Sequence, residues 1–313
     1  MILNKPKFWD YKKPSYLSYL LLPFTVLFML SNYFLNLKKK NKNYINIKTL
    51  CLGNIYVGGT GKTPLSIKIS QILQNLGFKT ATIKKYYKNQ IDEQKLLNSK
   101  TKLYCSKKRV HALHEAVKDN IDIAIFDDGL QDKSINYDLK FVCFSSKNWI
   151  GNGMLIPAGP LREKLKDISK YDAIFLNGNQ ENTDNLKILI KRIKSDIKIF
   201  ETYYEPVNMH ELDNTKNYLI FSGIGNPHSF KKTLLKNNFK IVHEIDFPDH
   251  YQYKKKDIIN IKSIARSLNA NILTTEKDFV KIAQNDSREI KFLEISLIVK
   301  KQEELISFIK SNL

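Results

Sequence analysis

Cysteine is scarce in this chain of 313 residues, which contains only three. Cys51, Cys105 and Cys143 are odd in number, widely spaced and set in or beside apolar runs. This distribution excludes a disulfide framework and contains no metal-ligand motif, because both require paired residues at characteristic intervals. We therefore expect three small core residues in a protein of a reducing compartment.

Arginine and acidic residues are also few. Only five arginines occur among 51 basic residues, and 31 acidic residues leave a net charge of +20. Such an excess favours an anionic partner, whether a membrane surface, a phosphorylated substrate or a nucleic acid, although much of the lysine is also consistent with solvated surface. We expect no nucleic-acid partner, because there is no binding motif and no arginine-rich patch interleaved with aromatic residues. No obligate protein partner is evident from the sequence.

Charge is missing altogether from residues 14–37, which are mostly Leu, Phe and Tyr and lie between two groups of lysines. As a helix this run would reach about 36 Å, enough to cross a hydrocarbon core of about 30 Å. Pro23 interrupts it, and its polar residues fall on one helical stripe, namely Ser18, Thr25, Asn32 and Asn36. This pattern favours an anchor lying in the membrane interface. A spanning helix and a helix packed against the protein's own body remain alternatives, whereas the lack of a small-residue cleavage site argues against a signal peptide.

The rest of the chain alternates between strand-like and helix-like patterns. This alternation predicts an α/β protein with a parallel sheet of the P-loop NTPase type, helices on both faces, and a second, smaller α/β unit. We expect an N-terminal membrane-associated segment at 1–45, a P-loop core at 46–205 and a C-terminal α/β domain at 206–313, with the junction near Glu205-Pro206. The predicted strands are Ile47 to Leu52, Thr80 to Ile83, Ile121 to Phe126, Ile197 to Glu201, Tyr218 to Ser222, Lys240 to Phe247, Asn271 to Thr274 and Phe292 to Ile298.

A glycine-rich turn follows the first predicted strand and precedes a helical pattern. It departs from the usual Gly-x-x-x-x-Gly-Lys-Ser/Thr motif only at the first glycine, where Tyr56 stands. Such a turn lets backbone N–H groups point at phosphate oxygens, with Lys62 reaching the β- and γ-phosphates and the Thr63 hydroxyl suited to Mg²⁺. We therefore predict an ATP site formed by Tyr56, Val57, Gly58, Gly59, Thr60, Gly61, Lys62 and Thr63.

Two adjacent carboxylates end the predicted strand at Phe126. Asp127 and Asp128 are placed where nucleotide-binding sheets hold Mg²⁺, opposite the loop threonine, so we predict a metal site formed by these aspartates and Thr63. The alternative is an ordinary turn, for which Asp-Asp-Gly is also suitable sequence.

Four further positions carry chemistry less distinctly. Arg162 and Glu163 end a stiff Pro-Ala-Gly-Pro-Leu turn, where a planar donor suits phosphate, although a surface helix start would look the same. His250 follows a predicted strand, where a lone histidine is more often a structural hydrogen-bonding group than a catalyst. Asp92, considered alone, would pass as a solvated surface charge.

Taken together, the motifs resemble one family, the tetraacyldisaccharide 4′-kinases of lipid A biosynthesis. The likeness extends over essentially the whole chain and rests on the order and spacing of an apolar N-terminal segment, Gly53-Asn54 through Thr63-Pro64, Asp127-Asp128-Gly129-Leu130-Gln131, Gly151-Asn152-Gly153, Pro157 to Glu163, Gly223-Ile224-Gly225-Asn226-Pro227, Asp249-His250 and Thr274-Thr275-Glu276-Lys277-Asp278.

The resemblance implies a membrane-bound kinase that transfers the ATP γ-phosphoryl group to the 4′-hydroxyl of a tetraacylated glucosamine disaccharide 1-phosphate, forming lipid IVA. It implies action at the cytoplasmic face of the inner membrane, with Mg²⁺ and an anionic membrane surface as partners. It further implies that Lys62, Asp128, Arg162 and Glu163 act near the reacting groups and that Asp92 and His250 deprotonate the hydroxyl. These roles agree with the needs of phosphoryl transfer.

The chain departs from the family pattern at three places. Lys85-Tyr86-Tyr87-Lys88 replaces Arg-Gly-Tyr-Gly and is followed by a shortened loop, Ile91-Asp92-Glu93-Gln94 replaces Gly-Asp-Glu-Pro, and Asp132 stands where a histidine is usual.

The alternative function is a membrane-associated switch ATPase of the partitioning or septum-site type. It is disfavoured because the signature lysine of that loop is Val57 here and because the apolar segment is N-terminal.

Overall fold

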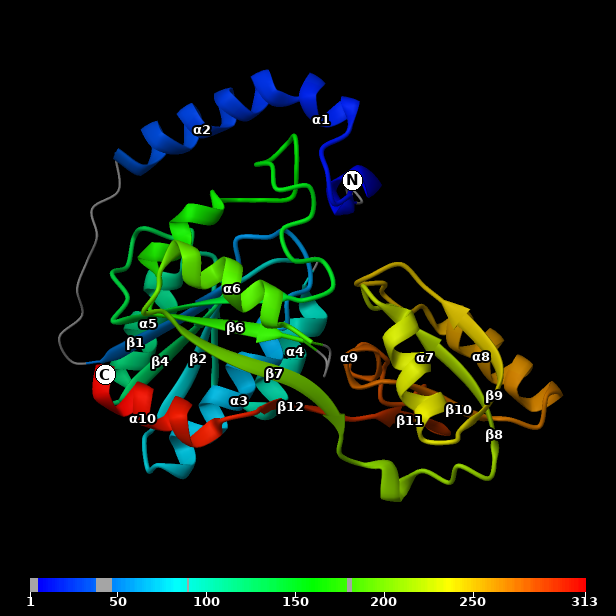
Figure 1. Cartoon of the computed structure of the whole chain (residues 1–313). Helices are drawn as coiled ribbons and strands as arrows, with labels where there is room; N and C mark the ends of the chain where they lie inside the picture. Colours follow the sequence, from blue (N-terminus) through cyan, green and yellow to red (C-terminus); the bar gives the residue numbers. More distant parts are fainter. Residues whose placement is uncertain (1–4, 38–46, 89, 179–181) are drawn as a thin grey trace. The chain divides into compact units, whose positions relative to one another are not determined.

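The computed structural model describes residues 5–37, 47–88, 90–178 and 182–313, with the backbone alone for 32–37. The chain divides into two compact units (Figure 1). The first comprises Met1–Lys85, Tyr104–Tyr203 and Ile298–Leu313, and the second comprises Tyr86–Leu103 and Tyr204–Leu297. Each unit is thus built from separate stretches of the chain.

The first unit is organised on an eight-stranded sheet. Its order is β12 (Ile295–Val299), β7 (Lys198–Pro206), β6 (Ala173–Asn177), β5 (Leu139–Ser145), β1 (Lys48–Gly53), β4 (Ile123–Asp127), β2 (Thr80–Lys85) and β3 (Leu103–Ser106). The pairs from β7 to β2 in this order are parallel, which confirms the predicted parallel α/β architecture. The four innermost strands, β6, β5, β1 and β4, are mostly buried because helices cover both of their faces.

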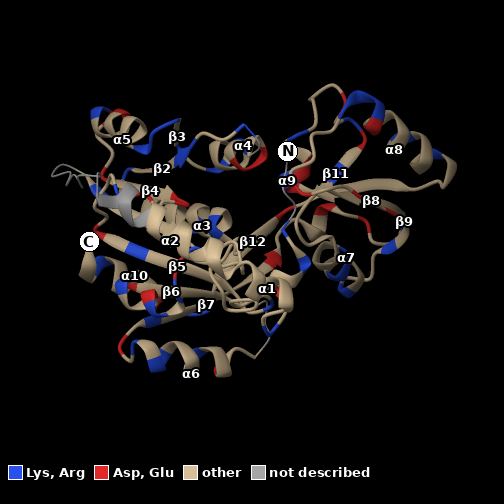
Figure 2. Cartoon of the chain, turned by 90° about the horizontal axis from the view of Figure 1, so that it is seen from above, with Lys and Arg blue, Asp and Glu red and all other residues tan. Residues whose placement is uncertain are grey.

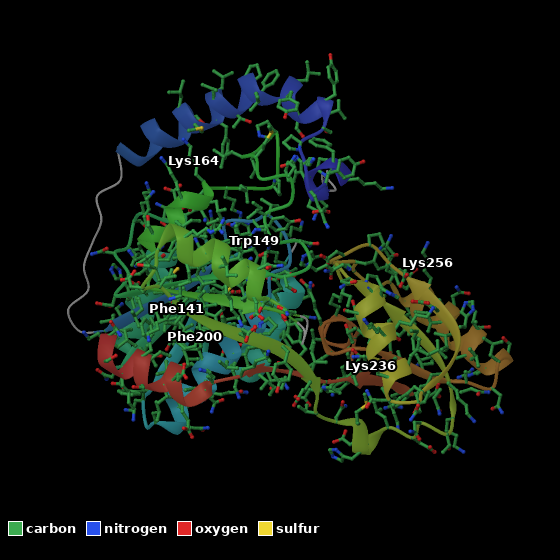
Figure 3. The ribbon with its side chains drawn as sticks, in the orientation of Figure 1. Phe141, Trp149, Lys164, Phe200, Lys236 and Lys256 are labelled. Carbon is green, nitrogen blue, oxygen red and sulfur yellow. The ribbon has the colours of Figure 1, made fainter. Side chains whose placement is uncertain are left out.

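Helices α5 (Arg109–Lys118) and α6 (Asp184–Ile193) lie on one face, where their apolar residues pack with alternate strand residues such as Cys51 and Ile174. Helix α10 (Gln302–Asn312) lies on the other, with the ring of its Phe308 6.2 Å from Phe141 and 5.9 Å from Phe200 (Figure 3). Helix α3 (Lys62–Asn75) packs on β1, β2 and β4. The helix after the glycine loop therefore lies on the central strands.

The second unit has a four-stranded parallel sheet in the order β11 (Ile290–Leu293), β10 (Asn271–Thr275), β8 (Asn217–Ser222) and β9 (Lys240–Asp246). Alternate residues of β8 face its two covering helices: Tyr218 and Ile220 pack with α7 (Pro227–Lys236), and Leu219 and Phe221 with α8 (Lys255–Ser267). Helices α4 (Ile91–Lys100) and α9 (Glu276–Phe279) and a short 3₁₀ turn at Met209–Glu211 complete the unit, whereas the 3₁₀ turn at Leu165–Lys170 belongs to the first unit.

The single strand predicted at Phe292 to Ile298 is wrong. The chain forms two strands there, β11 and β12, which belong to different sheets. They are separated at Glu294, whose backbone N–H donates to the Asn208 side-chain oxygen at 2.9 Å instead of to a sheet neighbour. A continuous apolar pattern does not reveal such a break.

The uncharged N-terminal run forms two helices, α1 (Tyr16–Leu20) and α2 (Leu22–Leu37), after a 3₁₀ turn at Lys7–Asp10. The interruption falls at Leu21, just before Pro23. Neither helix, nor any other in the described part of the chain, is long and apolar enough to cross a membrane.

The described half of the polar stripe, Ser18 and Thr25, faces the protein. Ser18 and Thr25 are buried, with 0% and 5% of their surfaces exposed. The Asn152 side chain donates to Ser18 Oγ at 3.0 Å, and Thr25 Oγ1 lies 3.4 Å from the Leu155 carbonyl oxygen. The apolar side chains consequently point outward, among them Tyr16, Leu17, Leu20, Phe24, Val26, Leu27 and Leu30. No residue of 14–31 carries a charge, and the ribbon of α1 and the described part of α2 accordingly shows no Lys, Arg, Asp or Glu colour in Figure 2. The side chains of Asn32 and Asn36 lie outside the described set.

Candidate active site

The glycine loop connects β1 to α3 and is folded tightly. Gly58 and Gly61 have φ angles of +144° and +86°, values that favour glycine, and the Asn54 side chain donates to the Gly58 carbonyl oxygen at 3.1 Å. The Thr60 hydroxyl is buried and finds no hydrogen-bond partner among the described residues. A buried hydroxyl beside the N-terminus of a helix is a suitable donor for a phosphate oxygen.

Two neighbouring segments hold the loop from outside. The Val57 N–H donates to the Pro160 carbonyl oxygen at 2.8 Å, and the Arg162 N–H donates to that of Ile55 at 2.7 Å. Tyr56, which replaces the usual first glycine, is 1% exposed, and its hydroxyl donates to Asp10 of the N-terminal segment. The Pro160–Arg162 turn is thereby fixed directly against the nucleotide loop.

Asp127 ends β4 beneath the start of α3. It is fully buried and accepts from the Thr63 hydroxyl at 3.1 Å and, more weakly, from Ser66 Oγ at 3.4 Å. The Lys84 ammonium from β2 lies 2.5 Å from the same carboxylate. The predicted metal residues Thr63 and Asp127 are therefore brought together, with a lysine that the prediction did not include.

Asp128 lies between two cations that sequence reasoning named separately. Its Oδ1 is 3.7 Å from Lys62 Nζ and 3.2 Å from the Arg162 guanidinium. Burial alone would raise the pKa of this carboxyl, but the positive charges of Lys62, Arg162 and their neighbours outweigh it and hold the pKa below its usual value. Asp128 has a φ of +60°, and the Arg109 guanidinium binds its carbonyl oxygen.

Glu163 is turned toward neutral partners instead of a cation. It accepts from the Gln131 side chain at 2.9 Å and from the Tyr171 hydroxyl at 2.7 Å. Burial raises the pKa of Tyr171, and the Glu163 carboxylate raises it further, so the phenol remains a proton donor. Gln131 also accepts from Arg162 at 3.1 Å, which links Glu163 to the cation beside Asp128.

The second unit holds the predicted Asp–His pair. Asp92 lies in the first turn of α4, and its two carboxylate oxygens are 3.0 and 2.9 Å from His250 Nδ1. The Asp92 side chain is 0% exposed and that of His250 is 24% exposed. The aspartate therefore fixes the Nδ1 edge of the imidazole, and Nε2, on the opposite edge, lies 3.7 Å from Asp249 Oδ2.

Lys277 completes this pair. Its ammonium lies 3.4 Å from Asp92 and 3.2 Å from Asp249. Burial would raise the pKa of Asp92, but the hydrogen bond from His250 and the charge of Lys277 hold it far below its ordinary value. Burial would lower the pKa of Lys277. The negative charges of Asp92 and Asp249 outweigh this effect, and the pKa of Lys277 is raised.

Sequence reasoning assigned no role to Lys84, Arg109, Gln131 or Lys277. Lys84 gave one signal, because a charged residue at the carboxyl end of a buried strand lies at the edge where α/β sheets bind ligands.

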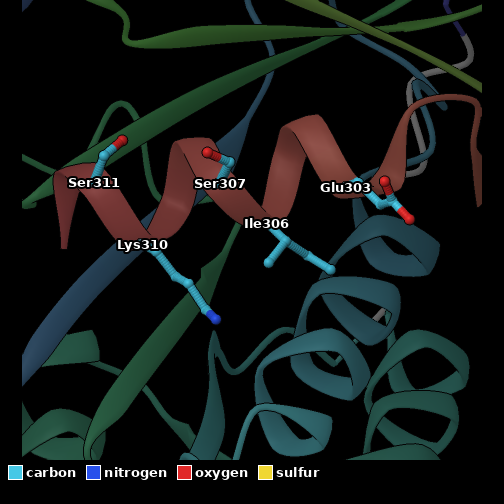
Figure 4. Close-up of a pocket in the computed structure, with 5 residues that line it drawn as sticks. All are labelled: Glu303, Ile306, Ser307, Lys310 and Ser311. Atoms are coloured by element: carbon cyan, nitrogen blue, oxygen red, sulfur yellow. The ribbon is translucent and has the colours of Figure 1, made fainter.

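The surface depression in Figure 4 is separate from these groups. It is lined by residues of α10 alone and includes none of the residues around Asp128 or Asp92.

The donor set of the first unit fits a magnesium nucleotide. The Thr63 hydroxyl and the carboxylates of Asp127 and Asp128 are the oxygen ligands that Mg²⁺ prefers. Among the described residues no three His, Cys, Asp or Glu side chains could hold a metal ion by themselves. Mg²⁺ usually binds through one or two protein oxygens together with substrate phosphates.

A parallel α/β sheet, a glycine loop opening a helix, and aspartates at the neighbouring strand end define a P-loop protein of the phosphotransferase or ATPase class. The family model for tetraacyldisaccharide-1-P 4'-kinase (LpxK) matches residues 17–313. The chain belongs to this family.

Named relatives agree. The tetraacyldisaccharide 4'-kinase of Pelagibacter ubique is 48% identical, over 100% of this chain and 99% of its own length. That of Rickettsia bellii is 34% identical, with 91% of each chain covered. The crystal structure of LpxK from Aquifex aeolicus in complex with ATP covers 94% of this chain and 99% of its own, with a TM-score of 0.74 and 22% identity, and so supports the fold.

Proposed function

We propose that this protein transfers the γ-phosphoryl group of ATP to the 4′-hydroxyl of a tetraacylated glucosamine disaccharide 1-phosphate, forming lipid IVA. Family membership supports the reaction, and the observation that carries the site is the convergence of Lys62 and Arg162 on Asp128 at the start of α3. Two cations beside a glycine loop are the arrangement that a γ-phosphate requires.

In the proposed step the 4′-oxygen attacks the γ-phosphorus, the bond from that phosphorus to the bridging oxygen breaks, and ADP leaves. The hydroxyl proton goes to His250 Nε2. His250 is the better acceptor of the pair because Asp92 is fully buried and its pKa is held low, whereas His250 is partly exposed. Asp92 would hold the imidazole tautomer that has its proton on Nδ1, so that the unprotonated Nε2, 3.7 Å from Asp249, can accept the proton.

Lys62, Arg162 and the loop N–H groups would hold the phosphates while negative charge spreads over the transferred group. Thr63 and Asp127, with Asp128, would hold Mg²⁺, which neutralises phosphate charge when bound. Glu163 would act indirectly. It accepts a hydrogen bond from Gln131, and Gln131 in turn accepts one from Arg162, so Glu163 helps to position the Arg162 guanidinium.

We also propose attachment at the cytoplasmic face of the inner membrane through α1 and α2. The support is the outward apolar surface of these helices, with Phe24 58% and Leu27 61% exposed while the polar stripe is tied to the body. An apolar face of this kind gains by entering the interfacial region of a bilayer, and the nearby lysines would favour anionic headgroups. The acyl chains of the substrate lie in the same layer.

The test is an assay of purified protein with radiolabelled ATP, Mg²⁺ and the disaccharide lipid in mixed micelles. The product lipid is then treated with mild acid, under conditions expected to leave a 4′-phosphate intact. Retention of the label on the lipid supports the proposal. Release of labelled phosphate without labelled lipid would instead support the switch-ATPase alternative. Omitting the lipid distinguishes background hydrolysis from transfer.

A further inference from the structure

Lys84 forms an ion pair that is shut off from solvent at the proposed metal site. It stands at register with Asp127 on the adjacent strand, with 3% and 0% of their side chains exposed. Breaking a buried pair of this kind is costly, because the remaining charge then has no compensation. Some other cation must therefore balance Asp127 if Lys84 moves or is removed.

The same carboxylate is the group that would accept Mg²⁺ together with Thr63. Lys84 Nζ lies 2.5 Å from Asp127 Oδ2, the oxygen that also accepts from the Thr63 hydroxyl. An ammonium at this distance neutralises the carboxylate and repels a second cation, an effect that is strong in a site of low dielectric. Free Mg²⁺ therefore gains little by binding to this protein alone.

We propose that Lys84 is a resident cation that lowers the affinity of the Asp127 site for free Mg²⁺, so that the metal enters with the nucleotide and not before it. The phosphates supply the negative charge that the pair lacks, which makes binding of the magnesium nucleotide favourable even with the ammonium in place. This inference rests on the proposed magnesium role of Thr63 and Asp127.

The experiment measures binding of MgCl₂ alone to EDTA-treated protein by calorimetry, with thermal unfolding as a second readout. Lys84→Met removes the charge and keeps the length of the side chain. We expect it to bind Mg²⁺ at least tenfold more tightly than the wild type and to regain in Mg²⁺ the Tm that it loses in EDTA. Lys85→Met is the matched control, since the next residue of the strand points to the opposite face. It should bind Mg²⁺ as the wild type does.

Wild-type protein should show little change of Tm in millimolar Mg²⁺ and a clear rise with Mg²⁺ and a non-hydrolysable ATP analogue together. Lys84→Ser, which leaves room for water, serves if the methionine variant does not fold in EDTA. A variant that gains no Mg²⁺ affinity, or stays unfolded in Mg²⁺, overturns the inference. If the gain survives adding Asp127→Asn, the metal is not held at Asp127 and the magnesium assignment itself fails.

Discussion

His250 Nδ1 lies 2.9 Å from a carboxylate oxygen of Asp92, although 158 positions separate the two residues in the chain. The segment that carries Asp92 leaves the first unit after β2 and packs in the second, beside the loop that follows β9. The His250 backbone, with a φ of +61°, is held by hydrogen bonds from its N–H to Gly223 and Asp249. The imidazole is thus fixed from both its side chain and its backbone.

This relationship predicts that Asp92→Asn and His250→Ala each lower kcat for lipid phosphorylation by about 10²- to 10⁴-fold. The effects on KM should be smaller, because a proton acceptor acts in the chemical step. The double variant should be little worse than the poorer single variant, since the two residues act as a unit. Steady-state kinetics with both substrates varied would show this. His228→Ala, on exposed α7, is the control. An unchanged kcat would remove the altered residue from the proton-transfer step.

Asp92 also predicts how stability depends on pH. Its pKa lies well below the ordinary value of 3.8, so the native state keeps the carboxylate ionised where the unfolded chain takes up a proton. Its contribution to stability is therefore full above about pH 5 and is lost as pH falls through the native pKa. Denaturant unfolding from pH 6 to pH 3 should show wild type and Asp92→Asn converging in stability. A constant difference across this range would contradict the assigned shift.

Lys62 predicts the behaviour of the nucleotide site. Lys62→Ala should lower phosphoryl transfer by at least about 10²-fold, because a cation aimed at the transferred group stabilises developing charge. The fold should survive, since the side chain makes a long 3.7 Å contact to Asp128 and is not part of the core. Transfer assays and circular dichroism would be compared with Lys68→Ala on the same helix. Undiminished transfer would show that the loop does not grip the γ-phosphate.

Arg109 predicts a positioning effect on Asp128. Its guanidinium joins the Asp128 carbonyl oxygen to the Asp132 carboxylate, 3.2 Å away, at a residue held in the left-handed region. Arg109→Lys loses the two-pronged geometry, and we expect about a tenfold fall in kcat. Asp132→Asn should act in the same direction, and the two changes should not add.

A double-variant cycle on kcat would measure this coupling. Arg266→Lys, at a site 74% exposed, is the matched control. Additive effects of Arg109→Lys and Asp132→Asn would mean that the two residues act separately.

The N-terminal helices predict membrane attachment through particular side chains. Leu20→Asp with Leu27→Asp should abolish sedimentation with anionic vesicles, because both residues lie on the exposed apolar face. Ser18→Ala should still sediment, since Ser18 faces Asn152 and not the outside. Point variants are sharper than deleting residues 1–37, because deletion would also uncover the body beneath. Continued sedimentation of the doubly charged variant would exclude this surface as the anchor.

Local patterns predicted much of the first sheet. β1, β2 and β4 lie within a few residues of the predicted strands, because short apolar runs and glycine turns specify them without help from distant residues. β5 and β6 were not predicted. Both are short apolar runs flanked by polar turns, and periodicity cannot distinguish such runs from buried helix or loop.

The sequence by itself determined the glycine loop, the aspartates that end β4 and the family, since each depends on residues that are neighbours in the chain. Only the tertiary structure decided three things: that Lys84 lies against Asp127, that the stretch around Asp92 joins the C-terminal unit, and that Ser18 and Thr25 of the polar stripe face inward. The reason is physical. Burial and charge pairing depend on which surfaces meet, and the periodicity of a single segment does not specify the surface it meets.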